Sequence, residues 1–242
     1  MTRSIEMPAS QPRRDLLRVA GLGAVAVLAG RPGSLAAAGH DYPKSTLTPD
    51  QALEKLLAGN ARFAAHPDVC IADLAGRRAA VAAAQAPWAT IIACADSRVP
   101  PELLFGGIGL GELFVARNAG NLADQATIGT VEYGAAVLGS PLILVLGHSN
   151  CGAVAAACDV LTEHATFPGA IGPMIEPIVP AAIAVKGQPG DLVANTVAES
   201  ARRSVRRLLT ASQLLAKLDG TGALRIVAGV YDLESGKVAF LD

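Results

Sequence analysis

The sequence predicts an α/β fold in which a mainly parallel central sheet is flanked by helices. Two apolar runs, Ala89–Ala93 and Leu142–Leu146, have the length of buried strands, and each leads directly into polar residues. Between and after these runs, apolar residues recur at helical spacing. Strands that alternate with helices are typical of parallel sheets, because the connection between two parallel strands crosses over through a helix. The 242 residues, 51% of them hydrophobic, suffice for one domain with a sizeable core.

The first predicted elements are two helices and two strands. Thr48 is suited to cap a helix that begins with Pro49 and carries Gln51 at its third position. The apolar stripe of this helix is predicted to consist of Leu53, Leu56, Leu57 and Phe63. A second helix is predicted over Arg77–Ala86, followed by strands over Ala89–Ala93 and Leu113–Arg117.

The second half of the chain continues the alternation. Helical spacing relates Ile128, Val131, Ala135 and Leu138, and the next predicted strand spans Leu142–Gly147. Later predicted elements are a helix after Gly152, helices over Pro173–Val185 and Asp191–Leu209, a strand over Leu224–Val230 and an edge strand over Val238–Leu241. Two arginine pairs, at 202–203 and 206–207, resemble a phosphate-binding patch, but their i,i+4 spacing favours a solvated helix face that pairs with Glu199.

The first 38 residues are predicted to be a targeting segment that lies outside the fold. Pro12–Arg18, with Arg13 and Arg14, resembles a twin-arginine export signal, and an apolar stretch too short to span a membrane follows. Ala36–Ala38 offers an A-x-A cleavage site. The predicted domains are therefore a signal peptide over 1–38 and a single folded domain over 39–242, with a periplasmic location. A membrane anchor and a disordered tail are the alternatives.

The charge of the chain gives no indication of a nucleic-acid partner. The formal net charge is −1 and the pI is about 6.4. Cleavage after residue 38 would remove five of the 20 Lys and Arg and two of the 21 Asp and Glu, which leaves 15 basic and 19 acidic side chains. A cleaved chain would carry no stable membrane span.

The polar residues that follow the two apolar runs are suited to bind a metal. Cys94 and Asp96 follow the first run at a spacing that lets both side chains point the same way, and His148 and Cys151 follow the second. Thiolate and imidazole ligands suit zinc better than magnesium or calcium. Ordinary buried thiols are the alternative for each cysteine alone. A structural zinc site with four protein ligands is a further alternative, although such sites usually contain closely spaced Cys pairs.

Arg98 bears on the number of ligands that a metal would have. It follows Asp96 by two residues, so its guanidinium can form a bidentate pair with that carboxylate. The pair would compete with zinc for Asp96 and leave Cys94, His148 and Cys151 as ligands. A fourth position would then be open for water, which is the arrangement of catalytic zinc sites. A surface ion pair of little consequence is the alternative for Arg98.

With these motifs the chain resembles a β-class carbonic anhydrase over roughly residues 48–242. The matching segments are C-A-D-S-R-V-P-P-E from Cys94, G-E-L-F-V-A-R-N-A-G-N from Gly111, V-E-Y-G from Val131 and G-H-S-N-C-G-A from Gly147. The resemblance implies a β-carbonic anhydrase-like fold and one zinc ion per chain. It places the zinc ligands at Cys94, His148 and Cys151 and the catalytic dyad at Asp96 and Arg98. It also implies a homodimer or a larger homo-oligomer.

The resemblance also implies a substrate pocket formed by Gln85, Phe114, Tyr133 and Ala119. Gln85 precedes the first ligand by nine residues, as in plant-type members of the family, and Ala119 stands where a Val is common.

The regulatory features of the family are matched only in part. Ile91 occupies the position of the Trp found in the bicarbonate-regulated subgroup, whereas the Arg used with that Trp is matched by Arg117. Gln85 and Ile91 together favour the plant-type subgroup, in which the zinc site is open.

The predicted activity is the reversible hydration of CO₂ to bicarbonate and a proton by zinc-bound hydroxide. Zinc lowers the pKa of a bound water from about 15.7 towards 7, so hydroxide is available at neutral pH. Asp96 would orient that hydroxide, and Gln85 would bind a substrate oxygen. The alternatives are a CS₂ or COS hydrolase with the same site and a non-catalytic zinc-binding protein. Two further cysteines, Cys70 and Cys158, could form a disulfide, although the sequence gives no indication of it.

Overall fold

The computed structural model describes residues 43–69, 74–107 and 109–242. The described residues belong to one compact unit. The predicted signal segment over 1–38 lies outside the described residues, as does Cys70. None of the described helices combines the length and the apolar character that crossing a lipid bilayer requires.

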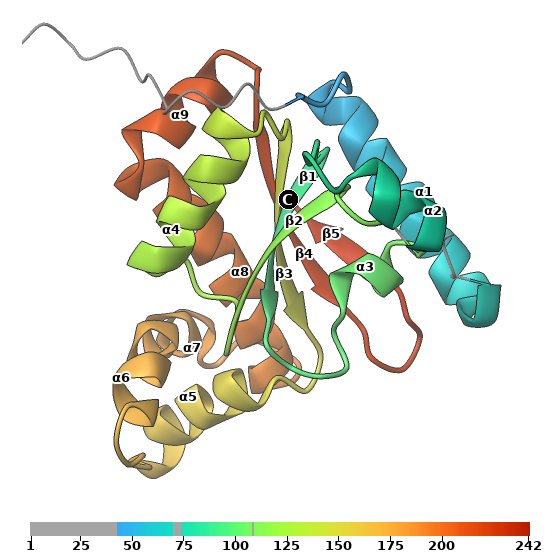
Figure 1. The fold of residues 1–242 in the computed structure, drawn as a ribbon. Coiled ribbons are helices and arrows are strands. Elements are labelled where there is room, and N and C mark those ends of the chain that lie inside the picture. Colours follow the sequence, from blue (N-terminus) through green and yellow to red (C-terminus); the bar gives the residue numbers. More distant parts are fainter. Residues whose placement is uncertain (1–42, 70–73, 108) are drawn as a thin grey trace, which may run out of the picture. The chain divides into compact units, whose positions relative to one another are not determined.

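The central sheet confirms the predicted α/β class. Its strands are β1 (Ala89–Cys94), β2 (Leu113–Asn118), β3 (Leu142–His148), β4 (Arg225–Tyr231) and β5 (Val238–Leu241). They lie in the order β2-β1-β3-β4-β5 (Figure 1). The first four strands are parallel, and β5 pairs with β4 in the antiparallel direction. The carboxyl ends of β1, β2 and β3 therefore meet at one edge.

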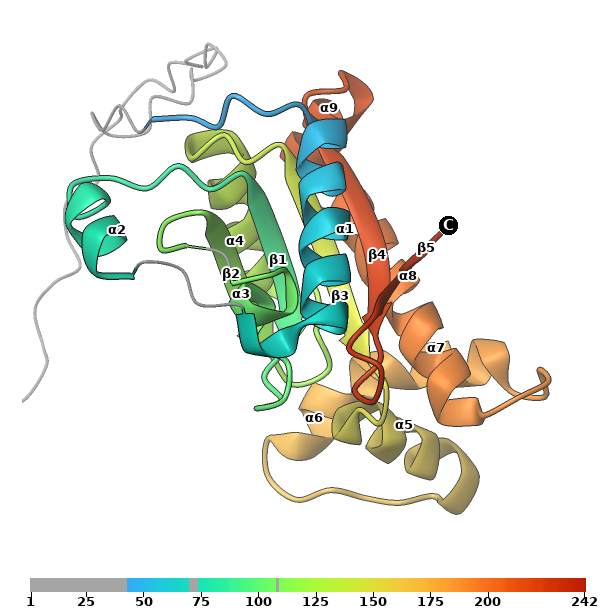
Figure 2. The ribbon, with the colours of Figure 1, turned by 90° about the vertical axis from the view of Figure 1, so that its right-hand side faces the viewer.

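Helices cover both faces of this sheet, as predicted. The helices are α1 (Pro49–Ala65), α2 (Leu74–Ala80), α3 (Pro101–Leu104), α4 (Gln125–Glu132), α5 (Gly152–Glu163), α6 (Ile171–Ile175), α7 (Val179–Val185), α8 (Leu192–Ala211) and α9 (Gln213–Gly220). Helices α1 to α3 lie on one side of the sheet, and α4, α8 and α9 lie on the other (Figures 1 and 2).

The side chains of β1 and β3 alternate between two hydrophobic clusters, one on each face. Ile91 and Leu144 pack with α1, whereas Ile92 and Val145 pack with residues of α4 and α8. Successive residues of a strand point to opposite faces, so a strand that is apolar throughout must be covered on both sides. A third cluster, at the carboxyl ends of the strands, contains Cys94 together with residues of α5 and α7.

The start of α1 forms as its sequence predicts. The Thr48 hydroxyl accepts a hydrogen bond from the Gln51 amide, and the Gln51 side chain accepts one from the Thr48 amide. This reciprocal pair satisfies two amides at the helix start. Of the predicted stripe, Leu56 is fully buried and Leu53 and Phe63 are partly buried. Leu57 is 46% exposed, so its assignment to the stripe was wrong.

Two predicted helices have different bounds in the structure. The helix predicted over Arg77–Ala86 is α2, which ends at Ala80. The alanine-rich sequence around it favours a helix throughout and contains no cap that would define the end. The single helix predicted over Pro173–Val185 is divided into α6, a 3₁₀ turn (Glu176–Ile178) and α7. Pro177 and Pro180 explain the division, because proline lacks the amide that continues a helix.

Two short helices were not predicted, whereas two other predictions are confirmed. Helices α3 and α9 are the additional elements. Helix α4 continues into a π-helical turn (Tyr133–Val137). The four residues at helical spacing across α4 and this turn are all buried: Ile128, Val131, Ala135 and Leu138. Helix α8 is capped by the Asp191 side chain, which accepts a hydrogen bond from the Ala194 amide.

Candidate metal centre

The structure brings Cys94, His148 and Cys151 together at the carboxyl edge of the sheet. Cys94 ends β1, and His148 ends the adjacent parallel strand β3. The three potential ligand atoms lie within 4.8 Å of one another, and all three residues are buried. Among the described residues, this is the group of His, Cys, Asp and Glu side chains whose geometry could hold a metal ion.

Cys151 reaches the cluster because a tight turn separates it from His148. Asn150 adopts a left-handed conformation (φ 54°) in this turn, which asparagine tolerates better than most residues. Cys151 is the N-cap residue of α5. The amides of Ala153 and Val154 face its sulfur and act to lower the pKa of the thiol. A helix start of this kind favours the thiolate that a metal needs.

The imidazole of His148 is oriented for binding through Nε2. Its Nδ1 lies 2.9 Å from the carbonyl oxygen of Ser149. A carbonyl can only accept, so Nδ1 carries the proton and Nε2 keeps a free lone pair. Nε2 is buried and has no hydrogen-bond partner among the described residues. A buried nitrogen in this state costs free energy unless a ligand occupies its lone pair.

These residues fit a zinc ion. The two sulfur atoms are 4.0 Å apart, and a tetrahedral site with Zn–S bonds of about 2.3 Å would place them about 3.8 Å apart. The separation is far too long for a disulfide, whose S–S bond is about 2.05 Å. Two sulfurs and one imidazole form a donor set that suits zinc better than magnesium or calcium. The unpartnered Nε2 atom supplies the third position.

The sulfur atoms of Cys94 and Cys151 are close enough for a hydrogen bond between them. A hydrogen bond from Cys151 lowers the pKa of the Cys94 thiol to about 4, and the same contact, with burial, raises the pKa of Cys151. Burial acts to lower the pKa of His148, but Cys94, the Ser149 carbonyl and the Asp96 carboxylate together outweigh burial and raise it. The cluster thus already stabilises negative charge on sulfur.

Asp96 and Arg98 form a bidentate ion pair beside the cluster. Arg98 Nε donates to Asp96 Oδ1 at 2.9 Å, and a terminal nitrogen of Arg98 donates to Oδ2 at 2.7 Å. The backbone amide of Arg98 also donates to Oδ1. The guanidinium holds the pKa of the Asp96 carboxyl well below its usual range. Asp96 therefore remains a carboxylate throughout the neutral pH range and can only accept hydrogen bonds.

The ion pair also lies against the second ligand segment. Asp96 Oδ2 is 3.9 Å from Nε2 of His148, and Arg98 donates to the carbonyl oxygen of Asn150 at 3.4 Å. Asp96 is nevertheless outside the group of three ligand atoms that lie within 4.8 Å of one another. The geometry is therefore that of three protein ligands with a carboxylate held next to them by an arginine.

Three of the four predicted pocket residues lie at the opposite end of the strands from the cluster. Gln85 precedes β1, and Phe114 pairs in register with Thr90 near the amino end of that strand. Tyr133 lies beside Phe114, with 6.1 Å between the ring centroids. Ala119, by contrast, follows β2 directly and precedes Gly120, whose amide donates to the Cys94 sulfur. A single chain thus places Ala119, but not the other three, beside the ligands.

Gly120 is a contact of the cluster that the sequence reasoning did not single out. Its amide donates to the Cys94 sulfur at 3.4 Å. Its φ of 80° favours glycine, and a Cβ atom at this position would lie 2.8 Å from the Ile178 side chain. The signal in the sequence is the Ala-Gly-Asn segment directly after β2, where glycine allows close approach of the backbone.

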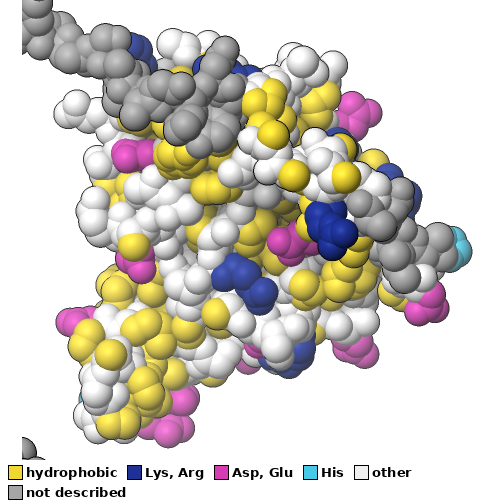
Figure 3. Space-filling view, in the orientation of Figure 1, with side chains coloured by type: hydrophobic (Ala, Val, Ile, Leu, Met, Phe, Trp, Pro, Cys, Tyr) yellow, Lys and Arg dark blue, Asp and Glu magenta, His cyan; other side chains and the backbone are white. Residues whose placement is uncertain are grey.

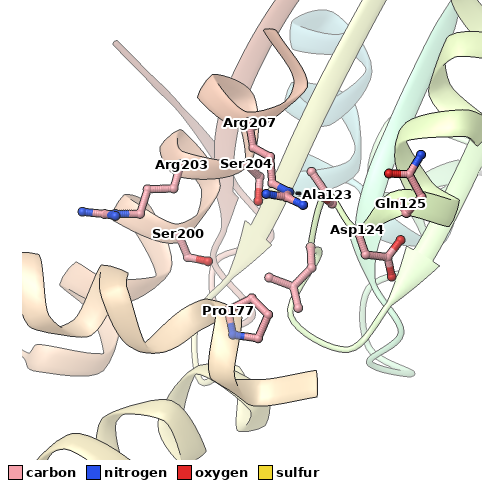
Figure 4. A pocket seen from close by; sticks show the side chains of 9 residues that line it. Ala123, Asp124, Gln125, Pro177, Ser200, Arg203, Ser204 and Arg207 are labelled. Carbon is pink, nitrogen blue, oxygen red and sulfur yellow. Dashed lines mark hydrogen bonds between the residues drawn. The ribbon is translucent and has the colours of Figure 1, made fainter. Parts of the chain in front are cut away.

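A cavity of about 350 Å³ lies between the start of α4 and helix α8, and none of the three potential ligands lines it (Figure 4). Its charged groups are engaged with the protein: Arg207 Nε donates to the Ala123 carbonyl, and the Asp124 carboxylate caps α4. Arg203 pairs with Glu199, which also pairs with Arg206. The predicted pairing with Glu199 is thus confirmed for Arg203 and Arg206, whereas Arg202 and Arg207 donate to the backbone carbonyls of Asp242 and Ala123.

Comparisons with known proteins agree with the geometry. The family model described as carbonic anhydrase matches residues 89–238. Carbonic anhydrase 2 of Mycobacterium tuberculosis is 35% identical over 198 residues, which are 80% of this chain and 93% of that protein. The carbonic anhydrase of Mycolicibacterium smegmatis is 36% identical over 190 residues, which are 78% of this chain and 92% of that protein.

A solved structure gives the class. The β-carbonic anhydrase of Coccomyxa, determined in complex with acetazolamide, superposes with a TM-score of 0.61 at 31% identity, over 78% of this chain and 86% of that one. The range matched by the family model, residues 89–238, includes both strand ends that carry the cluster. The chain therefore belongs to the β-class carbonic anhydrase family of enzymes.

Proposed function

We propose that this protein is a zinc-dependent enzyme that interconverts CO₂ and bicarbonate. The observation that carries the proposal is the arrangement of Cys94, His148 and Cys151, with the carboxylate of Asp96 held beside them by Arg98. A structural zinc site has no need of an arginine that withholds a nearby carboxylate. Three ligands with a fourth position available to solvent are the arrangement of a catalytic site.

The residues of the site have separate tasks in this reaction. Zinc, when bound, supplies the charge that lowers the pKa of a water molecule to about 7. Asp96, which stays ionised, accepts a hydrogen bond from the attacking oxygen and so directs its lone pair towards CO₂. Arg98 holds both carboxylate oxygens, which fixes the direction of that hydrogen bond and keeps Asp96 away from the ligands. The proton released by the reaction passes to buffer.

The expected result for the purified protein is about one zinc ion per chain and rapid CO₂ hydration. A strong chelator should remove both, because it competes with the three protein side chains for zinc. Added zinc should restore both, because the three side chains remain in place. Elemental analysis gives the zinc content, and stopped-flow measurement with a pH indicator gives the rate. Zinc-loaded protein without hydration activity would favour the non-catalytic alternative. Turnover of CS₂ or COS in place of CO₂ would favour the hydrolase alternative.

We further propose that a second copy of the chain completes the substrate pocket. Phe114 lies on β2, which is an edge strand of the described sheet and is only partly buried. Tyr133 beside it is 40% exposed. The face that carries β2 shows many hydrophobic side chains (Figure 3). Pairing of two copies along this edge would cover these side chains and bring Phe114 and Tyr133 towards a partner's ligands. Light scattering of the purified protein should give at least twice the chain mass.

We propose a periplasmic location through the twin-arginine pathway, on the basis of residues 1–38 of the sequence. Changing Arg13 and Arg14 together to Lys should retain the protein in the cytoplasm, because the pathway reads the arginine pair and not the charge alone. Cell fractionation followed by immunoblotting measures the distribution. The matched control is Arg3→Lys with Arg31→Lys, which changes two arginines outside the pair. Periplasmic delivery of both variants at the normal level would contradict this proposal.

A further inference from the structure

Arg117 links the carboxyl end of β2 to the segment that carries Cys94 and Asp96. It lies on β2, in register with Ala93 of β1. Its Nε donates to the carbonyl oxygen of Cys94 at 3.0 Å, and a terminal nitrogen donates to the carbonyl oxygen of Asp96 at 2.6 Å. One guanidinium therefore bridges the two backbone carbonyls of the residues that supply a sulfur ligand and the catalytic carboxylate.

This bridge supports a part of the chain that lies just beyond the end of strand β1. Strand β1 ends at Cys94, and Asp96 lies beyond it. After the strand, the Ala95 amide donates to the Asn118 carbonyl, and the Gly120 amide contacts the Cys94 sulfur. These two contacts hold Ala95 and the thiol. The Asp96 carbonyl also accepts a hydrogen bond from the Val99 amide at 3.0 Å, which is a local turn contact. Arg117 is the side chain that ties this carbonyl to that of Cys94, so the backbone direction between the two residues depends on it.

We infer that Arg117 is a positioning residue that sets the Cys94 sulfur and the Asp96 carboxylate in their relative orientation. The planar guanidinium presents its donors in a fixed fork, which suits two acceptors two residues apart. A lysine ammonium at the same place keeps the charge but is a single point donor on a flexible stem. The role rests on the proposed function. Both hydrogen bonds use one edge of the guanidinium, formed by Nε and a terminal nitrogen.

The test is Arg117→Lys in the zinc-loaded full-length protein. The expected zinc dissociation constant, measured by competition with a chromophoric chelator, is raised about tenfold, the lower end of what loss of a group that orients a ligand costs. The visible absorption spectrum of the cobalt-substituted protein should change, because the direction of the Cys94 ligand shifts. The kcat of CO₂ hydration should fall about tenfold or more, with KM nearly unchanged.

Arg207→Lys is the matched control. Its Nε also donates to a backbone carbonyl, that of Ala123, but this contact lies outside the ligand segments. Zinc affinity, cobalt spectrum and kcat should all remain at wild-type values in this variant. If Arg117→Lys does not fold, Arg117→Gln, which keeps donors without the charge, is measured in the same way.

An Arg117→Lys protein with wild-type zinc affinity and an unchanged cobalt spectrum would overturn the inference. The same changes in Arg207→Lys would also overturn it, since they would show a general response to loss of an arginine. Failure of the proposed function is distinguishable from both results. A wild-type protein that binds zinc without hydrating CO₂ fails in activity only, whereas zinc affinity and the cobalt spectrum still decide the role of Arg117.

Discussion

Replacing Cys151 with Ser should abolish zinc binding and CO₂ hydration together. The sulfur of Cys151 lies 4.0 Å from that of Cys94, and the residue occupies the N-cap position of α5. A serine hydroxyl remains protonated at neutral pH and is a poor zinc ligand. We expect zinc content to fall to a small fraction of one per chain after dialysis and kcat/KM to fall by about 100-fold or more. Elemental analysis and stopped-flow assays measure the two quantities.

Cys158→Ser is the control for this change. Cys158 is also buried and lies on the same helix, but its sulfur contacts Thr196 and lies outside the candidate metal centre. This variant should keep its zinc and its activity. Full zinc occupancy in the Cys151→Ser protein would refute the ligand assignment, whatever its activity.

Replacing Arg98 with Ala should reduce activity steeply while zinc content stays near that of the wild type. Asp96 loses both hydrogen bonds to the guanidinium and keeps the one that the backbone amide of residue 98 donates to Oδ1. Oδ2, which lies 3.9 Å from Nε2 of His148, can then join the three ligands. Four protein ligands hold zinc at least as well as three and close the position that water needs. Loss of an oriented charged group typically costs about 100-fold or more in kcat.

Arg203→Ala is the matched control for Arg98→Ala. It also removes an arginine paired with a carboxylate, that of Glu199 at 2.8 Å, but on α8 and outside the candidate metal centre. Its hydration rate should remain normal. Near-normal hydration by Arg98→Ala would reduce the pair to a structural ion pair. A wild-type crystal structure at neutral pH with Asp96 bound to zinc would contradict the expectation that the fourth position is open.

The local signals in the sequence were sufficient to predict that Cys94, His148 and Cys151 form one cluster. Cys94 and His148 follow apolar runs of strand length, and polar residues at the carboxyl ends of parallel strands meet at one edge. The N-cap of α1 and the bidentate pair of Asp96 with Arg98 involve residues two or three positions apart. Short-range geometry of this kind is set by the backbone, and for this reason the sequence alone predicts it.

Other features depend on contacts between residues far apart in the chain, and the sequence analysis missed or misplaced them. The exposure of Leu57 is decided by which side of α1 meets the sheet. The end of α2 is decided by the path of the chain to β1, because an alanine-rich segment contains no stop signal. Each of these outcomes depends on where a distant part of the chain lies. Helical or strand periodicity carries no information about that position.

The sequence by itself determined the fold class, the three potential zinc ligands and the Asp96–Arg98 pair, since each follows from residue type, strand period or close spacing. The tertiary structure decided that β2 lies next to β1, so that Arg117 and Gly120 reach the Cys94 segment. It also decided that Gln85, Phe114 and Tyr133 lie at the far end of the strands. The physical reason is that strand order and direction are set by packing of the whole core, which only the folded chain establishes.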